Sequence, residues 1–313
     1  MRAVTIRDGA LSLEEHPDPE PGSGEILVAV HAAGLNGADM LQRKGAYPAP
    51  AGSPADIPGL ELAGEVVGRG RGAERFEEGD RVMAVVGGGG QAELAVVHER
   101  GAMPVPADLD WPQAGGTPEV FVTAHDAIFS QGGLLPGERL LVHGGAGGVG
   151  TAAIQLGRAA GARVTATVRN EDLRGKVEGL GADAIGPEEY VDAGPFDVIL
   201  ELVGAPNLGG NVKALATAGR IVVIGVGAGA KAEINLVALM GKRGVVRGST
   251  LRARPLEEKA AAMRLVEKEV LPLFASGTLA VPVAETFSLD EVEAAYERFS
   301  KGGKFGKVVL VTG

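Results

Sequence analysis

Residues 140–150 of this 313-residue chain have the sequence LLVHGGAGGVG. An apolar strand pattern leads into glycines at 145, 147 and 150, in the spacing G-x-G-x-x-G, and a helical pattern follows. This context is typical of the first βα turn of a doubly wound α/β sheet. The first glycine permits a tight turn, the second lets a pyrophosphate approach the backbone, and the third lets helix and strand pack closely. We therefore expect a dinucleotide to contact the glycine loop and first helical turn, namely Gly145, Gly147, Gly148, Val149 and Gly150.

The rest of the chain divides by pattern. Short β-type runs occupy the beginning, at 2–7, 25–32, 64–70, 80–86 and 92–97. Strand and helix patterns then alternate, with strands at 140–142, 163–168, 198–202, 221–225 and 245–248 and helices at 149–160, 172–180 and 208–216. The last part predicts helices at 256–276 and 289–299 and strands at 282–287 and 308–311. Alternation of this kind predicts a parallel sheet with helices on both faces, and the final strand is expected to rejoin the first domain.

The end of the second predicted strand indicates which dinucleotide binds. An NAD-binding chain usually places Asp or Glu there, where it accepts hydrogen bonds from the ribose 2′-hydroxyl. This chain has Val168 and Arg169 instead, with Arg174 further along. A guanidinium group attracts a 2′-phosphate, so the sequence favours NADPH, with NADH expected to bind more weakly. The alternative is that Arg169 is a solvated loop residue.

Charge and composition exclude several classes of protein. The net charge of −10 disfavours a nucleic-acid binder or a protein of anionic membranes, because both need a basic surface. The 313 residues contain no cysteine, which rules out disulfides and thiolate metal sites and suits a cytoplasmic protein. Charged residues within the first ten positions argue against a secretory signal.

Several further motifs carry a family resemblance across the whole chain. They are GLNGAD at 34–39, LQRKGAYP at 41–48, PGLELAGEV at 58–66, GDRV at 79–82, PEVFVTA at 118–124 and GSTLRARP at 248–255. With the glycine fingerprint they resemble medium-chain dehydrogenase/reductases, in particular the zinc-free quinone oxidoreductase branch that includes ζ-crystallin. The last two motifs look most like the p53-inducible quinone oxidoreductase subgroup. The resemblance implies a Rossmann dinucleotide-binding domain at 117–277 and a GroES-like, mainly β catalytic domain at 1–116 and 278–313.

The same resemblance bears on zinc. Zinc alcohol dehydrogenases of the superfamily hold the catalytic metal with a cysteine, a histidine and a second cysteine. Here Asn36 stands at the first cysteine position and Leu60 at the histidine, and Glu61 alone cannot hold zinc. We therefore expect no metal site and no alcohol oxidation by the zinc route.

The resemblance also implies the remaining site residues. Asn36, Tyr47 and Thr123 match positions that line the nicotinamide pocket, where each can donate a hydrogen bond to a developing oxyanion. Each also has a structural interpretation, as a turn residue, a loop aromatic and a helix-packing residue respectively, and no dedicated general acid is evident. Further cofactor contacts are expected after two strands, at Gly225, Val226, Ser249 and Leu251.

The remaining polar residues are assigned no role. His125 and Asp126 are expected to be solvated rather than a catalytic pair, and Asp39 and Glu61 to be structural. The chain departs from the family pattern at Leu41 and Pro187, where related enzymes carry tyrosines.

These observations favour an NADPH-dependent, zinc-independent reductase, an NADPH:quinone oxidoreductase acting on a small-molecule quinone or related conjugated carbonyl. Reduction of enones or 2-enoyl thioesters uses the same hydride geometry and is the enzymatic alternative, with Tyr47 as the proton donor. An NADPH-binding structural or RNA-binding protein is the non-enzymatic one, and the acidic composition counts against RNA. Strand 245–248 is expected at the edge of the parallel sheet, where it would pair with a second copy in a homodimer.

Overall fold

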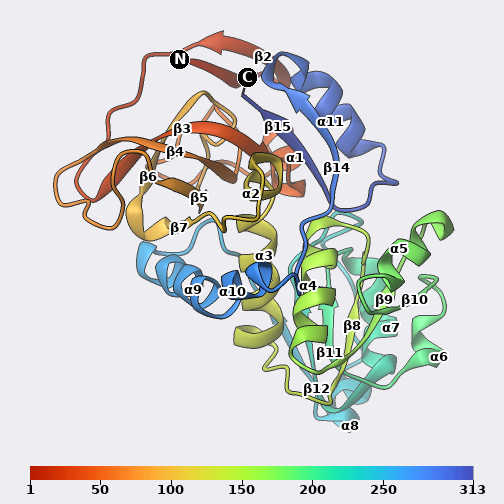
Figure 1. The fold of residues 1–313 in the computed structure, drawn as a ribbon. Coiled ribbons are helices and arrows are strands. Elements are labelled where there is room, and N and C mark those ends of the chain that lie inside the picture. The colour runs from red at the N-terminus through yellow and green to blue at the C-terminus, as the bar shows by residue number, and fades with distance from the viewer. Residues whose placement is uncertain (313) are drawn as a thin grey trace. The chain divides into compact units, whose positions relative to one another are not determined.

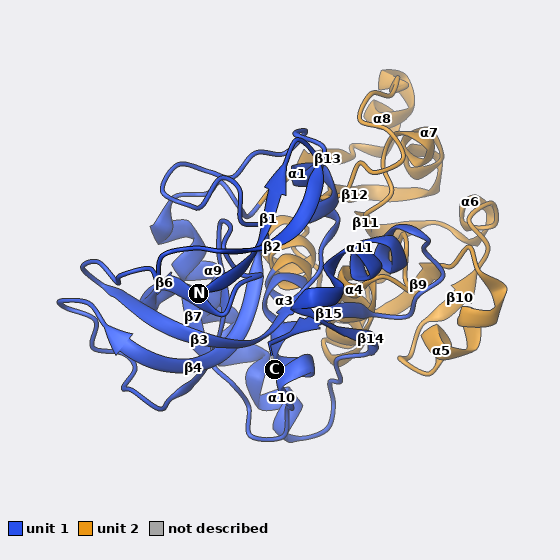
Figure 2. Ribbon diagram, turned by 90° about the horizontal axis from the view of Figure 1, so that it is seen from above, with its two compact units in different colours: residues 1–122, 251–313 blue, residues 123–250 orange. Residues whose placement is uncertain are grey.

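The computed structural model describes residues 1–312, which form two compact units (Figure 1, Figure 2). The first unit contains Met1–Val122 and the segment from Leu251 onward, and the second contains Thr123–Thr250. The sequence predicted boundaries after residues 116 and 277, whereas the compact units divide after residues 122 and 250, with residues 251–277 in the first unit. In that unit α9 (Leu256–Glu269) packs against the 3-10 turn η1 (Glu99–Gly101) and β7 (Ala102–Pro104).

The first unit is built on a mainly antiparallel sheet with the order β14-β15-β3-β4-β5-β7, in which β6 also pairs with β3. Its strands are β1 (Arg2–Arg7), β2 (Ala10–Glu15), β3 (Glu25–Gly34), β4 (Glu61–Arg69), β5 (Arg81–Val85), β6 (Leu94–His98), β7, β14 (Val283–Ser288) and β15 (Lys307–Val311). Its helical segments include α1 (Gly37–Arg43), α2 (Trp111–Gly115), α9, α10 (Leu271–Ala275), the 3-10 turn η4 (Leu289–Glu291) and α11 (Val292–Ser300). Helix α3 (Pro118–His125) crosses from this unit into the second.

Alternate side chains of β3 form the core of this sheet. Ile26, Val28 and Val30 are buried with Leu62 of β4, as the period of two in a pleated strand requires. Gly64 of β4 crosses β3 so closely that a Cβ atom there would overlap the backbone of Ala29. As expected, the last strand rejoins this domain, since β15 pairs with β3.

The second unit contains a parallel sheet with the order β10-β9-β8-β11-β12-β13. Its strands are β8 (Arg139–Val142), β9 (Arg163–Thr167), β10 (Asp183–Ile185), β11 (Phe196–Glu201), β12 (Leu215–Val223) and β13 (Val245–Gly248). Its helical segments are the π-helical η2 (Asp126–Gln131), α4 (Gly148–Ala159), the 3-10 turn η3 (Glu171–Leu173), α5 (Arg174–Glu178), α6 (Tyr190–Ala193), α7 (Ala205–Ala214) and α8 (Leu236–Lys242).

This strand order is that of a doubly wound fold, whose switch point lies between its two central strands, here β8 and β11. The α/β class, the parallel sheet and the edge position of 245–248 are therefore confirmed. The predicted helix 256–276 is in fact two helices, α9 and α10, which meet at Val270, two residues before Pro272.

Candidate functional site

The glycine loop joins β8 to α4. A Cβ atom at Gly145 would lie 2.7 Å from the Cβ of Ala166, and one at Gly150 would overlap the carbonyl oxygen of Gly144. At Gly147, the N-cap of α4, the nearest atom would be 3.4 Å away. The N–H groups of the first helical turn, from Gly148 onward, have no acceptors within the helix. The loop is thus tight where strand and helix pack and open at the helix N-terminus, which fits the pyrophosphate of a dinucleotide.

A buried polar network holds this loop in place. His143 lies between Thr167 and Asn211, with its ring nitrogens 3.1 Å from the Thr167 Oγ1 and 2.7 Å from the Asn211 Oδ1. The Asn211 amide donates to Glu201 at 2.7 Å, and Gly144 N donates to the Thr167 hydroxyl at 3.3 Å. Burial lowers the pKa of His143, so the ring is neutral at pH 7 and acts here as a structural residue.

The end of β9 presents guanidinium groups. Val168 is buried and Arg169 is exposed. Arg174 pairs with Glu171 at 3.5 Å, yet its buried Nε has no hydrogen-bond partner within residues 1–312. The exposed guanidinium of Arg169 is available to a phosphate ligand, whereas the buried Arg174 Nε is not. The residues present therefore fit the 2′-phosphate of NADPH, and Pro187, also exposed, adds no donor.

The other predicted cofactor residues lie on both units. Gly225 follows β12, where a Cβ atom would overlap the carbonyl oxygen of Leu202, and Val226 is 44% exposed. Ser249 follows β13, and its hydroxyl lies 3.5 Å from the Asp126 carboxylate. Leu251 is buried and belongs to the first unit. Whether these four contact the cofactor stays a prediction.

The expectation for His125 and Asp126 was wrong. Both side chains are buried, because η2, which continues α3, packs against β11 and β12. Asp126 accepts a hydrogen bond from Gln131 at 3.2 Å, and the His125 ring lies 4.9 Å from that of Phe129.

Asn36 belongs to a buried ion-pair network in the first unit. Lys307 donates to the carbonyl oxygen of Leu35 at 2.8 Å, to Asn36 Oδ1 at 2.7 Å and to Glu61 Oε1 at 2.6 Å. The Asn36 amide nitrogen donates to Glu61 at 2.9 Å and to Gly34 O at 3.2 Å. Both ends of the amide are therefore engaged by the protein. Sequence reasoning missed Lys307, because nothing in residues 307–311 signals a partner 246 residues earlier.

Asp39 lies in the same buried region. Its carboxylate accepts hydrogen bonds from Asn36 N at 2.8 Å and from Gly59 N at 3.1 Å. Burial raises the pKa of Asp39 to about 6, with the two backbone donors opposing that shift. Its fully buried carboxyl supports the structural role expected for Asp39.

Tyr47 is half-buried beneath an arginine. The Arg252 guanidinium lies 5.1 Å from the centre of the Tyr47 ring and donates to Tyr47 O at 3.0 Å, Gly87 O at 2.8 Å and Gln42 Oε1 at 2.6 Å. Burial raises the pKa of Tyr47, and the nearby Arg252 charge opposes that shift. Tyr47 is therefore a protonated phenol at neutral pH, able to donate a hydrogen bond.

Glu119 and Thr123 lie four residues apart on α3, so they share one face of that helix. Glu119 N donates to Glu61 Oε2 at 2.9 Å, which ties the start of the helix to the Lys307 network. Thr123 is 9% exposed, one turn further along. The sequence analysis singled out Thr123 and overlooked Glu119.

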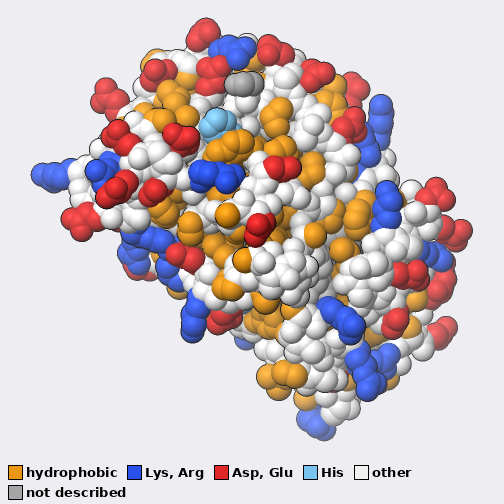
Figure 3. Space-filling model, viewed as in Figure 1, with side chains coloured by type: hydrophobic (Ala, Val, Ile, Leu, Met, Phe, Trp, Pro, Cys, Tyr) orange, Lys and Arg blue, Asp and Glu red, His pale blue; other side chains and the backbone are white. Residues whose placement is uncertain are grey.

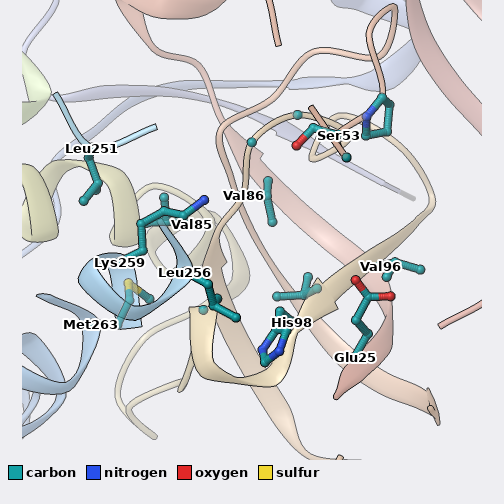
Figure 4. A pocket seen from close by; sticks show the side chains of 16 residues that line it. Glu25, Ser53, Val85, Val86, Val96, His98, Leu251, Leu256, Lys259 and Met263 are labelled. Carbon is teal, nitrogen blue, oxygen red and sulfur yellow. The ribbon is translucent and has the colours of Figure 1, made fainter. Parts of the chain in front are cut away.

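A cavity of about 150 Å³ lies in the first unit, and Tyr47, Glu119 and Thr123 are not among the residues that line it (Figure 4). Its wall combines apolar side chains, such as Val86, Leu256 and Met263, with the polar side chains of Glu25, Ser53, His98 and Lys259. Lys259 extends from α9 toward Val86 in Figure 4, with its ammonium 3.5 Å from the carbonyl oxygen of Arg252. Burial lowers the pKa of Lys259, while the Glu119 charge raises it.

The positions of a catalytic zinc do not fit that metal. Across the described residues, no three His, Cys, Asp or Glu side chains are grouped as a metal site requires. Leu60 offers no donor atom, and the oxygens of Asn36 and Glu61 already bind the Lys307 ammonium.

Comparison with known proteins agrees with the fold. Residues 22–107 match an alcohol dehydrogenase GroES-like domain and residues 161–310 a zinc-binding dehydrogenase domain. The chain is 31% identical to a quinone oxidoreductase of Rattus norvegicus over 99% of its length and 98% of the relative, and 30% identical to that of Homo sapiens over the same shares. A solved alcohol dehydrogenase superfamily protein from Novosphingobium aromaticivorans superposes with a TM-score of 0.87 at 30% identity, covering 100% of this chain and 99% of the other.

These similarities and the doubly wound sheet define an oxidoreductase that uses a nicotinamide cofactor. The chain belongs to the quinone oxidoreductase-like branch of the medium-chain dehydrogenase/reductase superfamily.

The surface agrees with the charge composition. Acidic and basic side chains are interspersed over the face shown in Figure 3. None of the helices within residues 1–312 has the length and apolar character needed to cross a membrane.

Proposed function

We propose that the protein is an NADPH-dependent, zinc-independent reductase that transfers a hydride to a quinone or a related conjugated carbonyl. The observation that carries the cofactor choice is the end of β9, where the exposed Arg169 follows the buried Val168 and no carboxylate is present at either position. Bound NADPH would supply the hydride. The glycine loop and the start of α4 would hold its pyrophosphate.

Zinc independence rests on the donor set of the first unit. A zinc ion would have to displace the Lys307 ammonium from Asn36 and Glu61, and Leu60 would still add no ligand. We infer that the carbonyl oxygen is instead stabilised by neutral hydrogen-bond donors, with Tyr47 and Thr123 as the candidates. Asn36 acts in this scheme by fixing the polar network.

The substrate class follows from the similarity to quinone oxidoreductases. The absence of cysteine is compatible with a reducing compartment, and we place the protein in the cytoplasm as part of the same proposal.

NADPH oxidation followed at 340 nm tests the proposal directly. The substrate panel is 1,2-naphthoquinone, 1,4-benzoquinone, an alkenal and crotonyl-CoA, each with NADPH and with NADH. We expect turnover with at least one quinone and a higher kcat/KM with NADPH. Preference for crotonyl-CoA or the alkenal would instead identify an enoyl or enone reductase, and no turnover with the panel would contradict the proposal.

A further inference from the structure

Glu201, the last residue of β11, is a buried side chain on which four hydrogen-bond donors converge. Its Oε1 accepts from Val203 N at 2.7 Å, from Gly204 N at 2.8 Å and from the Asn207 amide at 3.3 Å. Its Oε2 accepts from the Asn211 amide at 2.7 Å. Because donors occupy both oxygens, a proton on either one would face another hydrogen. The group therefore acts here as a carboxylate, which only accepts hydrogen bonds.

This acceptor fixes the direction of the hydrogen bonds that continue from it. The Asn211 amide nitrogen faces Glu201, so its Oδ1 faces the Nε2 of His143, 2.7 Å away, and that nitrogen must carry a hydrogen. Burial lowers the pKa of His143, so the ring is neutral and its Nδ1 accepts. The Thr167 hydroxyl, 3.1 Å away, therefore donates to Nδ1, while its oxygen accepts from Gly144 N at 3.3 Å. We call this series, from Glu201 to Gly144, the polar chain.

The two ends of the polar chain lie at the two loops beside the switch point of the sheet. Gly144 comes just after β8, in the glycine loop, and Val203 and Gly204 come just after β11, the strand paired with β8. In a doubly wound sheet the ligand binds in the crevice between such loops, outside the carboxyl ends of the strands. The polar chain therefore connects the two sides of the crevice in which a dinucleotide is expected.

The loop after β11 also supports the segment that follows β12. Ala228 N donates to Val203 O at 2.9 Å. Gly204 has a φ of 119°, and a Cβ atom there would lie 2.5 Å from the carbonyl oxygen of Gly229 and 2.9 Å from the Cα of Val226. A single Glu201 oxygen holds the two N–H groups of this tight turn. Through the turn it supports the segment containing Val226, one of the predicted cofactor contacts.

We propose that Glu201 is a positioning residue of the cofactor site, whose carboxylate orders the polar chain and so holds the glycine loop and the loop after β11 in the arrangement that binds a dinucleotide. The proposal requires a nicotinamide cofactor, but it depends neither on the choice of NADPH nor on the quinone substrate proposed above. Glu201 touches no reacting atom in this scheme and acts only through the side chains of the polar chain.

The tautomer of His143 tests the direction of the polar chain. Two-bond proton–nitrogen correlation spectra of protein with isotope-labelled histidine show which ring nitrogen carries a hydrogen, and the signal lost in His143→Gln identifies this ring. We expect the Nε2–H form in the wild type. Glu201→Gln keeps the two backbone bonds through its oxygen and turns its amide nitrogen toward Asn211, which must then turn its own oxygen to face it. The Asn211 nitrogen would donate to Nε2, so His143 should change to the Nδ1–H form.

Dinucleotide affinity tests the consequence for the site. By fluorescence titration, Glu201→Gln should weaken binding of the preferred cofactor, NADPH or NADH, about tenfold or more, because bonds to a charged acceptor are lost. Thr167→Val keeps the shape of the side chain but removes the hydroxyl that serves Gly144, so it should weaken binding as well. The double variant should bind little worse than the weaker single variant, since both changes break one chain. Glu178→Gln, exposed on α5 of the same unit, should change neither the tautomer nor the Kd.

The outcomes separate this proposal from the function proposed above. An Nδ1–H tautomer in the wild type, an unchanged tautomer in Glu201→Gln, or effects of the two substitutions that simply multiply would each overturn the role of Glu201. If Glu201→Gln does not fold, the wild-type tautomer and the Kd of Thr167→Val still decide, and an unchanged Kd there overturns the proposal. The expected tautomers and Kd values without any quinone turnover would contradict the proposed substrate and leave the role of Glu201 standing.

Discussion

Replacing Lys307 by methionine should destabilise the first unit strongly. The Lys307 and Glu61 side chains are 4% and 0% exposed and lie 2.6 Å apart. Methionine fills the space of the aliphatic stem but leaves Glu61, Asn36 Oδ1 and Leu35 O without their donor. Removing one partner of a buried pair typically costs about 3–5 kcal/mol.

Trp111 makes the assay specific to this unit. It is the single tryptophan of the chain, and its ring stacks on His31 at 4.4 Å and lies beneath Arg81. Urea unfolding followed by tryptophan fluorescence thus reports the free energy of unfolding of the first unit. Lys307→Met with Glu61→Gln should recover at least half of the loss, because no buried charge remains. As a control, Arg7→Met breaks an exposed ion pair with Glu14 and should cause no measurable loss.

The reasoning is wrong if Lys307→Met unfolds within about 1 kcal/mol of the wild type, below the range for a broken buried pair. It is also wrong if Glu61→Gln fails to relieve the deficit, since the cost would then not come from the stranded charge.

Three other predictions concern the cofactor, the metal and assembly. Arg169→Ala should weaken NADPH binding about tenfold or more while leaving the Kd for NADH unchanged, as fluorescence titration would show, and equal wild-type affinities for both would contradict the assignment. Dialysis against EDTA should leave kcat unchanged, and activity that is lost there and restored by zinc would refute the metal-free mechanism. We propose a homodimer through β13, whose Val245 and Val246 are 45% and 37% exposed. Sedimentation should show a dimer for the wild type and a monomer for Val246→Glu. A wild-type mass near 32 kDa would exclude the dimer.

Local patterns in the sequence predicted five of the six strands of the second unit and its glycine loop, but not β10, α6 or α8. The G-x-G-x-x-G spacing depends on contacts within a few residues or with the next strand, such as Gly145 against Ala166. The strand at 245–248 was predicted with the bounds that the structure has. Such features follow from periodicity and turn chemistry, which act over short distances along the chain.

The polar centre of the first unit could not be predicted in this way. Asn36, Glu61, Glu119 and Lys307 come from distant parts of the sequence, and each alone has an ordinary structural interpretation. Whether a buried carboxyl group has hydrogen-bond partners depends on every group around it. The unpartnered Oε2 of Glu119 could therefore be recognised only from the structure. Asn36 is one of the residues to which the family resemblance pointed. In the structure its side chain is hydrogen-bonded to Lys307 and Glu61.

The pairing of β15 with β3 also sets an order for biosynthesis. Residues 123–250 leave the ribosome as one continuous segment and can fold while later residues are still being made. The sheet of the first unit must wait for β15, which also carries the ammonium that neutralises Glu61. Until residue 307 emerges, a nascent chain holds Glu61 without its countercharge, so the inserted unit is expected to gain protease resistance earlier than the segments that enclose it.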